Sequence, residues 1–355
     1  HAQRSQWRRG LRDTQMNAQL TILRAGPSMT LQDMGRPGHL ALGLSRGGAA
    51  DTLALAEGAA LLGQPANTLA LEMAALGGEF QANEDVRIAL TGAPMRVRID
   101  GEVVVWNASH KLPAGARLSI GAATSGCYGY LHVGGGFSAD PFLGAGSAHL
   151  AAGIGALLQD GETLNIGPDK GRETNMMFEP EDRFNGGAVR LTPSFQTDLF
   201  GEDEIDRLQC EPLRRAARAN RMGVALTPQG GGYHVEGGRN VVSEIVMPGD
   251  IQITGDGVPF VLMVECQTTG GYPRIGTVLP CDLPRVAQAP AGTELRFRFV
   301  DLQEAVDLER SEANRRSDLG KRCRPLIRDP HKMRDLLSYN LIGGMIAGNE
   351  DFEDL

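Results

Sequence analysis

Aromatic residues, cysteines and long hydrophobic runs are all scarce in this chain of 355 residues. Only 5% of the residues are aromatic, which argues against a stacking platform for single-stranded nucleic acid. The formal net charge of −8 argues against a general polyanion binder, because phosphate contacts need clustered Lys and Arg. No apolar run approaches the roughly 20 residues that span a bilayer. We therefore expect neither a nucleic acid nor a membrane among its partners.

The five cysteines are scattered, and no Cys-x-x-Cys pair occurs. Neither a zinc knuckle nor a disulfide framework is therefore indicated. The sequence predicts a reduced, cytoplasmic protein. Cys266 follows the apolar segment Val261–Glu265, where an inert buried thiol is favoured over a nucleophile.

Familiar motifs of nucleotide and metal chemistry are missing as well. The chain has no Gly-x-x-x-x-Gly-Lys-[Ser/Thr] phosphate loop, no Gly-x-Gly-x-x-Gly fingerprint and no His-Glu-x-x-His zinc motif. It also has no Met-Lys-Met biotinylation site. We therefore predict no metal site and no nucleotide site built by this chain alone.

Glycine, by contrast, is abundant, with 47 residues or roughly twice the usual share. Many glycines indicate many turns, which favours short strands over helical bundles. Val86–Leu90 is one such strand, and Asp100-Gly101 predicts a hairpin between Met95–Ile99 and Glu102–Trp106. Further strands are predicted at Arg117–Ile120, Tyr128–Val133, Ala188–Leu191, Ile251–Thr254, Phe260–Val264 and Leu295–Val300.

Three helices are predicted. Asp51 is a suitable cap for a helix over Thr52–Leu62, which Gly63 would end. A second helix is expected within Asp203–Gln209 and a charged one over about Asp301–Asp318.

One stretch of the sequence occurs twice in similar form. A strand, a Thr-Gly turn and a later Pro-Ala-Gly turn appear at 84–118 and again at 249–295, which suggests two related β-rich halves. The second copy is longer by about fourteen residues, and the extra segment holds the polar, Gly-rich loop 266–274. That loop is the first site candidate.

The loop offers amide and hydroxyl groups, exposed backbone N–H groups, a phenol and a fixed positive charge. These come from Gln267, Thr268, Thr269, Gly270, Gly271, Tyr272 and Arg274. Such a set suits a planar amide, ureido or carboxylate group and the stabilisation of developing negative charge. An ordinary hairpin tip is the alternative, and the number of polar groups favours a binding function.

Arg36 and Arg46 lie on glycine-framed turns, where their guanidinium groups could clamp a carboxylate or phosphate. For Arg36, local pairing with Asp33 is an equally good interpretation. For Asp51, the structural role of helix cap is favoured over a substrate contact. Glu72 interrupts an apolar run and is interpreted as a buried carboxylate paired with an arginine such as Arg36. His110, His132 and His149 are interpreted as structural histidines, and no residue can be assigned as a catalytic base.

Several of these segments resemble the allophanate hydrolase subunit 2 family. The resemblance runs from about Met16 to Val300, and Asn220 stands where the family motif Asp-Arg-Met-Gly has Asp. The matching segments are Thr30–Gly38, Gly48–Asp51, Leu71-Glu72, Asn220–Gly223, Gln267–Pro273, Asp282 and Ala287-Gln288.

The resemblance implies a mainly β fold with a few helices, built from two cyclophilin-like β-barrel subdomains. It implies an ATP-dependent 5-oxoprolinase-type complex that opens 5-oxoproline to glutamate, with a subunit 1-type partner and possibly a third lactam-utilisation subunit. In that case the Gln267–Arg274 loop would hold the amide, and Arg36 and Arg221 would neutralise charge. ATP would be bound by partner subunits.

Two alternatives stay open. The chain could be half of a biotin-dependent carboxyltransferase acting on urea or a related amide, with biotin on a carrier protein. It could also be a non-enzymatic antagonist of a kinase-inhibitor protein.

Four segments are predicted along the chain. Residues 1–15 form a basic extension, expected to be disordered, that is either a targeting arm or, more in keeping with its start at His1, a remnant upstream of the true start. Residues 16–185 and 186–310 form the two β-rich subdomains. Residues 311–355 form a C-terminal extension in which Asp335–Gly348 is apolar enough for a docking helix and strand.

Overall fold

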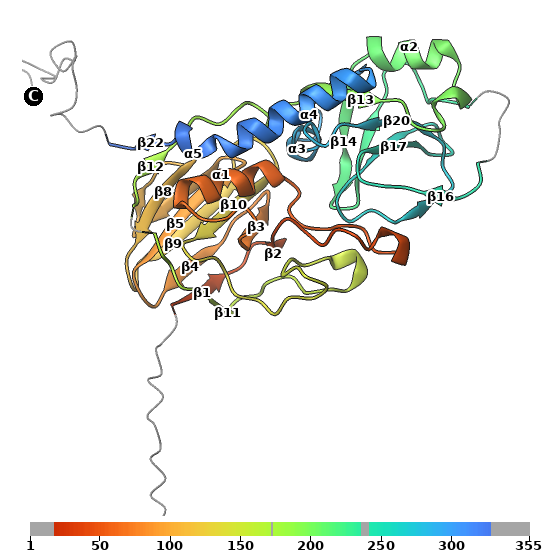
Figure 1. Cartoon of the computed structure of the whole chain (residues 1–355). Helices are drawn as coiled ribbons and strands as arrows, with labels where there is room; N and C mark the ends of the chain where they lie inside the picture. The colour runs from red at the N-terminus through yellow and green to blue at the C-terminus, as the bar shows by residue number, and fades with distance from the viewer. Residues whose placement is uncertain (1–17, 172, 236–240, 328–355) are drawn as a thin grey trace, which may run out of the picture.

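The strands of the protein form two groups in the computed structural model, which describes residues 18–171, 173–235 and 241–327 (Figure 1). We call the strands up to β12 the first half and those from β13 to β21 the second half. The predicted basic extension 1–15 and the predicted docking segment Asp335–Gly348 lie outside the described residues.

The first half consists of two sheets. One has the strand order β11-β1-β4-β9-β6-β7 and the other β2-β3-β10-β5-β8-β12-β22. The strands of the first sheet are β1 (Gln19–Arg24), β4 (Glu79–Ala82), β6 (Met95–Ile99), β7 (Glu102–Val103), β9 (Arg117–Ala123) and β11 (Thr163–Asn165). Those of the second are β2 (Met29–Gln32), β3 (Ala70–Ala74), β5 (Val86–Gly92), β8 (Ala108–Leu112), β10 (Tyr128–Val133), β12 (Met176–Met177) and β22 (Arg324–Pro325).

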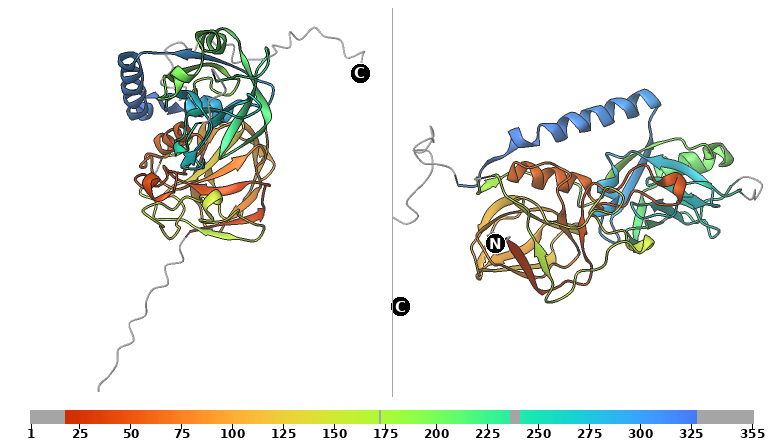
Figure 2. Two further views of the ribbon diagram at one scale, coloured as in Figure 1. Left: turned by 90° about the vertical axis from the view of Figure 1, so that its right-hand side faces the viewer. Right: turned by 60° about the horizontal axis from the view of Figure 1, so that its bottom comes forward.

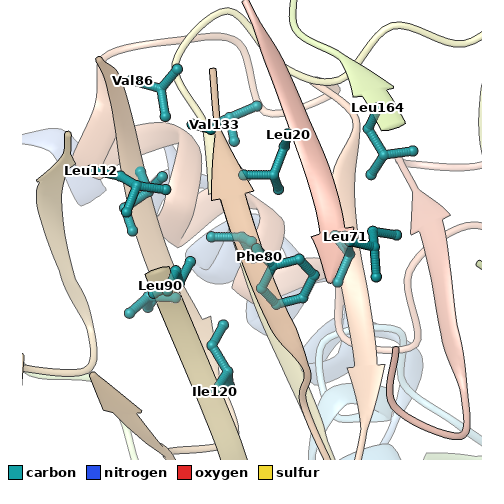
Figure 3. Packing of buried hydrophobic residues seen from close by; sticks show 14 of the residues in the cluster. Leu20, Leu71, Phe80, Val86, Leu90, Leu112, Ile120, Val133 and Leu164 are labelled. Carbon is teal, nitrogen blue, oxygen red and sulfur yellow. The ribbon is translucent and has the colours of Figure 1, made fainter. Parts of the chain in front are cut away.

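A single hydrophobic core joins these sheets. Leu20, Phe80 and Leu118 from the first sheet and Leu71 and Leu90 from the second are fully buried in it. Figure 3 shows Phe80 among Leu20, Leu71 and Leu90. Alternate residues of a strand face the same side, and Leu20 and Ile22 of β1, like Phe80 and Ala82 of β4, enter the core at every second position.

The second half is a closed barrel with the strand order β13-β20-β17-β18-β15-β14-β21. Its strands are β13 (Gly187–Thr192), β14 (Leu213–Asn220), β15 (Gly223–Thr227), β17 (Asp250–Ile253), β18 (Pro259–Leu262), β20 (Arg274–Val278) and β21 (Glu294–Phe299). Ile251, Val261 and Phe297 are buried in its core. A two-stranded ribbon, β16 (Glu244–Ile245) and β19 (Thr269–Gly270), lies beside it.

The three predicted helices are present, as α1, α2 and α4, and the structure adds two short helices that were not predicted. α1 covers Thr52–Leu62: the Asp51 carboxylate accepts from the backbone N–H groups of Leu53 and Ala54, and Gly63 ends the helix at φ +64°. The other helices are α2 (Glu202–Cys210), α3 (Leu283–Gln288), α4 (Leu302–Ser317), α5 (Leu319–Arg322) and the 3-10 turns η1 (Leu40–Leu42), η2 (Leu150–Ala152) and η3 (Thr197–Leu199).

Helix α4 connects the two halves. It starts beside the barrel and runs over α1 of the first half, as Figures 1 and 2 both show. After it, Leu319 of α5 packs on Leu53 and Ala56 of α1, and β22 pairs with β12 at the edge of the second sheet. The chain therefore leaves the first half, builds the barrel and returns to the first half.

The prediction of a mainly β protein with few helices is confirmed. The expected hairpin is also present, with Ile99 paired to Glu102 across the turn. The two copies of the internal repeat provide β5 and β17, one in each half, and the extra loop of the second copy carries β19.

Candidate functional site

The candidate site lies at the seam between the two halves, around Arg221. This arginine sits on the tight turn from β14 to β15. The Asn220 side chain shapes the turn, because its Oδ1 accepts from the Met222 N–H at 2.8 Å and the Gly223 N–H at 3.3 Å. A carboxylate oxygen could accept the same bonds, so Asn220 can replace the Asp of the family motif without changing the turn.

Arg221 binds two carboxylates from different parts of the fold. Its Nη1 pairs with Glu72 Oε1 on β3, and its Nε lies 2.6 Å from Glu265 Oε1, just beyond β18. Its Nη2 donates to the Gly48 carbonyl. Burial lowers the pKa of this guanidinium, but Glu72 and Glu265 outweigh burial and raise it overall. Arg221 therefore stays charged and ties the barrel to the first half.

Glu72 is held from three sides. Its Oε2 accepts from the Ala50 N–H at 2.8 Å and from the Tyr130 hydroxyl at 2.7 Å, in addition to the Arg221 pair on Oε1. The prediction of a buried carboxylate here is correct, but its expected partner is wrong: Glu72 pairs with Arg221 and not with Arg36. The Asn220–Gly223 turn brings Arg221 into reach, while Arg36 is engaged elsewhere.

A cavity of about 370 Å³, which we call the seam cavity, opens next to this cluster. Both halves contribute to its lining. Its lining residues are Ser28, Thr30, Glu72, Ala74, Tyr128, Leu150, Ala151, Leu157, Ala219, Asn220, Arg221, Met222 and Glu265. The mixture of apolar walls with a few converging polar groups is typical of small-molecule sites.

Tyr128 on β10 brings an uncommitted phenol to the seam cavity. Burial raises the pKa of its phenol, and the nearby Glu72 raises that pKa further. In the described part of the chain the hydroxyl has no hydrogen-bond partner. Tyr128 is therefore a neutral donor that can bind a carbonyl or amide oxygen of a ligand.

His149 lies behind Glu265, with Nδ1 at 4.0 Å from Glu265 Oε2 and Nε2 at 2.9 Å from Ser45 Oγ. The order Ser–His–Glu resembles a nucleophile triad. However, the Ala152 N–H donates to Nδ1 at 3.2 Å, which leaves the proton on Nε2 and makes Ser45 the acceptor. Burial also lowers the His149 pKa. Ser45 is therefore not activated, and the structural interpretation of His149 agrees with this geometry.

Arg36 and Arg46, both predicted to bind substrate, lie outside the seam cavity. Arg36 is 1% exposed, and its guanidinium donates to the carbonyls of Phe142 and Ser147, which secures the segment between them. Arg46 is exposed and donates from Nε to the Met34 carbonyl at 2.8 Å. A substrate contact by either residue stays a prediction.

Asp51 does more than cap α1. Its Oδ2 lies 2.7 Å from Arg183 Nε and accepts from Gln288 Nε2 of α3 at 2.8 Å. Arg183 also binds both oxygens of Glu57, at 2.9 and 2.6 Å. Asp51 is fully buried, so its contacts link α1 to the second half. These contacts support the structural role.

The loop Gln267–Arg274 folds over the outer face of β17. Arg274 is buried, with its Nη2 at 2.6 Å from Glu244 Oε2 and its Nη1 at 3.3 Å from Asp250 Oδ2. Gln267 and Tyr272 are exposed, and the ribbon β16–β19 holds the Thr269–Gly270 part. None of these loop residues, all of which the structure describes, lines the seam cavity. Glu265, two residues before Gln267, does line it.

The cysteine next to the loop is unreactive in this geometry. Cys266 is 2% exposed, and burial raises the pKa of its thiol to about 12. The preferred interpretation of an inert thiol agrees with this. Among residues 18–171, 173–235 and 241–327, no cluster of His, Cys, Asp and Glu could hold a metal ion, and no helix is long and apolar enough to cross a membrane.

Sequence reasoning named Arg221 and Glu72 but missed Tyr128 and Glu265 as site residues. Glu265 could have been recognised from the sequence, because it is a charged residue directly after an apolar strand. The polar loop that follows it was predicted as the site instead. Tyr128 had no such signal, because a tyrosine in a strand is ordinary. Only the fold brings these residues together.

The seam cavity does not suit a triphosphate. Its charged side chains are two carboxylates and one arginine that both of them already occupy. Phosphate groups need an excess of cations or free backbone N–H groups. The seam cavity is therefore not an ATP site. Tyr128, Ser28 and Thr30 can offer hydrogen bonds to a planar amide or ureido group, and Arg221 adds positive charge beside it.

The chain is similar in sequence to 5-oxoprolinase subunits and to urea carboxylases. It is 36% identical over 293 residues to a 5-oxoprolinase subunit from Escherichia coli (strain K12), covering 81% of this chain and 93% of that protein. It is 28% identical to a putative urea carboxylase of Emericella nidulans, covering 84% of this chain but 25% of that protein.

The fold is similar to that of Kluyveromyces lactis urea carboxylase. The TM-score is 0.74 at 22% identity, over 88% of this chain and 31% of that one. The family model "Carboxyltransferase domain, subdomain A and B" matches residues 42–299. The chain belongs to this carboxyltransferase-domain family.

Proposed function

We propose that this chain is a subunit of an ATP-dependent 5-oxoprolinase-type complex that hydrolyses a cyclic amide, 5-oxoproline, to glutamate. The observation that carries the proposal is the match to the Escherichia coli 5-oxoprolinase subunit, which extends over 93% of that protein. A cavity lined by hydrogen-bonding groups and sized for a small molecule is consistent with it. The complex would work in the cytoplasm, and a subunit 1-type protein would be the direct partner.

In this proposal the seam cavity holds the amide. The Tyr128 hydroxyl donates to the carbonyl oxygen, and the fixed charge of Arg221 favours the negative charge that develops on that oxygen. Glu72 and Glu265 keep Arg221 in place. Because both carboxylates are engaged by Arg221 and by backbone N–H groups, neither is a good proton acceptor. Partner chains would supply ATP binding and the group that activates water.

The loop Gln267–Arg274 is proposed to contact substrate or partner from beside the cavity. Thr269 and Tyr272 are exposed and can make such contacts, as can the exposed Gln267, whose Nε2 also donates to Gln252 Oε1 at 3.4 Å. Arg274 is instead held in its ion pairs with Glu244 and Asp250. Arg274 would therefore act on the loop's shape and not on the substrate.

The test is reconstitution with the cognate subunit 1-type and lactam-utilisation-type chains. We expect glutamate and ADP to form from 5-oxoproline and ATP only when all chains are present. Omitting this chain should abolish the reaction. A complete mixture that binds together but forms no glutamate would contradict the proposal.

A second function, half of a biotin-dependent carboxyltransferase acting on urea, is favoured by the 28% match to the putative urea carboxylase. The carboxyltransferase function predicts the opposite result in the reconstitution assay. Turnover would require urea, bicarbonate and a biotinylated carrier, and 5-oxoproline would be inert.

A further inference from the structure

A second cavity, of about 420 Å³, lies on the other side of the seam. The first half contributes Met34 to its lining, the barrel half contributes Met247 and Leu283, and α4 closes it. We call it the α4 groove. It shares a wall with the seam cavity, because Val264 lines the groove while the next residue, Glu265, lines the cavity.

The groove is lined mostly by aliphatic side chains. Met34, Met247, Val264, Leu283 and Ala313 are among them, and no aromatic residue is in the lining that the structure describes. Flexible methionines and short aliphatic chains adapt to an alkyl chain, while the absence of rings offers a flat aromatic ligand no stacking partner. The lining therefore fits an aliphatic body.

The charges around the groove are engaged, with one exception. Glu312 lies 2.6 Å from Arg316 Nε, and Arg316 Nη1 also donates to Thr52 Oγ1 at 3.2 Å. Glu309 Oε1 accepts from the Cys281 N–H at 2.8 Å.

Arg46 is different. In the described part of the chain its guanidinium contacts only the Met34 carbonyl, through Nε, so both terminal nitrogens are free. Arg46 is thus an exposed cation beside an aliphatic groove, with two parallel donors that have no acceptor. This is the geometry that binds a carboxylate in bidentate fashion.

We propose that the α4 groove binds an aliphatic monocarboxylate, with its carboxylate on Arg46 and its alkyl chain between Met34, Met247 and Leu283. The site is distinct from the seam cavity and does not depend on the proposed hydrolase function.

Methionine methyl NMR on the full chain tests this, with octanoate as the probe. Met34 and Met247 line the groove, whereas Met222 lines the seam cavity, so the three methyl signals report on both sites. We expect octanoate to shift the Met34 and Met247 signals saturably and to leave Met222 unchanged. 1-Octanol and octylamine, which lack the carboxylate, should bind at least about tenfold more weakly.

Two variants and one control sharpen the result. Arg46→Gln should weaken octanoate binding about tenfold, since it removes one charge-assisted contact. Ala313→Phe, at an exposed position of α4, should fill the groove and abolish binding. Arg98→Gln is the matched control, because Arg98 is also exposed and also contacts a single backbone carbonyl, that of Gly101.

Any of four outcomes would overturn the proposal. Three concern the wild-type chain: the absence of any octanoate-dependent shift of Met34 and Met247, a shift of Met222 in their place, and equal affinity of octanoate and 1-octanol. Unchanged octanoate affinity in folded Arg46→Gln would also overturn it.

Discussion

At the scale of a single residue, Arg274 shows how burial changes the role of a charged side chain. In sequence it belongs to a polar loop that looks built for ligands, yet in the fold its side chain is 8% exposed and faces Asp250, which is 3% exposed. A charge this deep contributes by neutralising its partner, because an unpaired buried carboxylate is costly.

Arg274→Ala is therefore predicted to act on stability. It should lower the free energy of unfolding by about 3 kcal/mol, because Asp250 is left buried without its cation. Urea denaturation measures this. Arg298→Ala is the matched control: its pair with Glu304 lies in solvent, and its removal should leave the denaturation midpoint nearly unchanged. Equal effects of the two substitutions would contradict the account.

The buried imidazole of His132 should make the free energy of unfolding depend on pH. Burial lowers its pKa from 6.5 to about 3, so the folded protein keeps this ring neutral where the unfolded chain protonates it. Its contribution is thus complete above pH 6.5 and is lost as the pH falls toward 3. Between pH 7.5 and 5.5 the loss is about 1.4 kcal/mol.

The measurement is urea denaturation of the wild type and His132→Gln at both pH values. The variant should lose about 1.4 kcal/mol less than the wild type on acidification. Identical pH slopes for the two proteins would show that His132 does not titrate in this way.

At the scale of elements, α1 and the β6–β7 hairpin were predictable because their signals are local. Asp51 and Gly63 mark the two ends of α1, and Asp100-Gly101 marks the hairpin turn. The return of the chain through α4 to β22 had no such signal. Pairing of β22 with β12 joins residues about 150 positions apart, which only tertiary packing determines.

Helix α1 also contains a glycine whose role only the packing reveals. Gly58 lies against the His132 ring, and a Cβ at this position would be 2.2 Å from His132 Nε2. Gly58→Ala should therefore destabilise the protein by about 2 kcal/mol, even though alanine gains up to about 1 kcal/mol in helix propensity.

Gly320→Ala in α5 provides the comparison for that substitution. Nothing lies within 4 Å of the added Cβ, so a slight stabilisation is expected. Both variants can be measured by thermal unfolding. A stabilising Gly58→Ala would contradict the packing of α1 on β10.

At the scale of the whole molecule, the site exists because the two halves meet. Glu72 and Arg221 are 149 residues apart in sequence, and their ion pair joins the two halves together with the hydrogen bond from Gln288 to Asp51. Sequence patterns identified Arg221 through a family motif but could not place Tyr128 or Glu265 beside it. Local patterns encode elements, whereas a cavity between halves depends on long-range packing.

The central claim is that the seam cavity holds the amide, and Tyr128→Phe tests it most directly. In the reconstituted mixture we predict that kcat/KM for 5-oxoproline falls about tenfold, because one hydrogen bond to the substrate is lost. Tyr233→Phe is the control, since Tyr233 is buried in the barrel core outside the cavity. A folded Tyr128→Phe chain with the wild-type kcat/KM would contradict the claim.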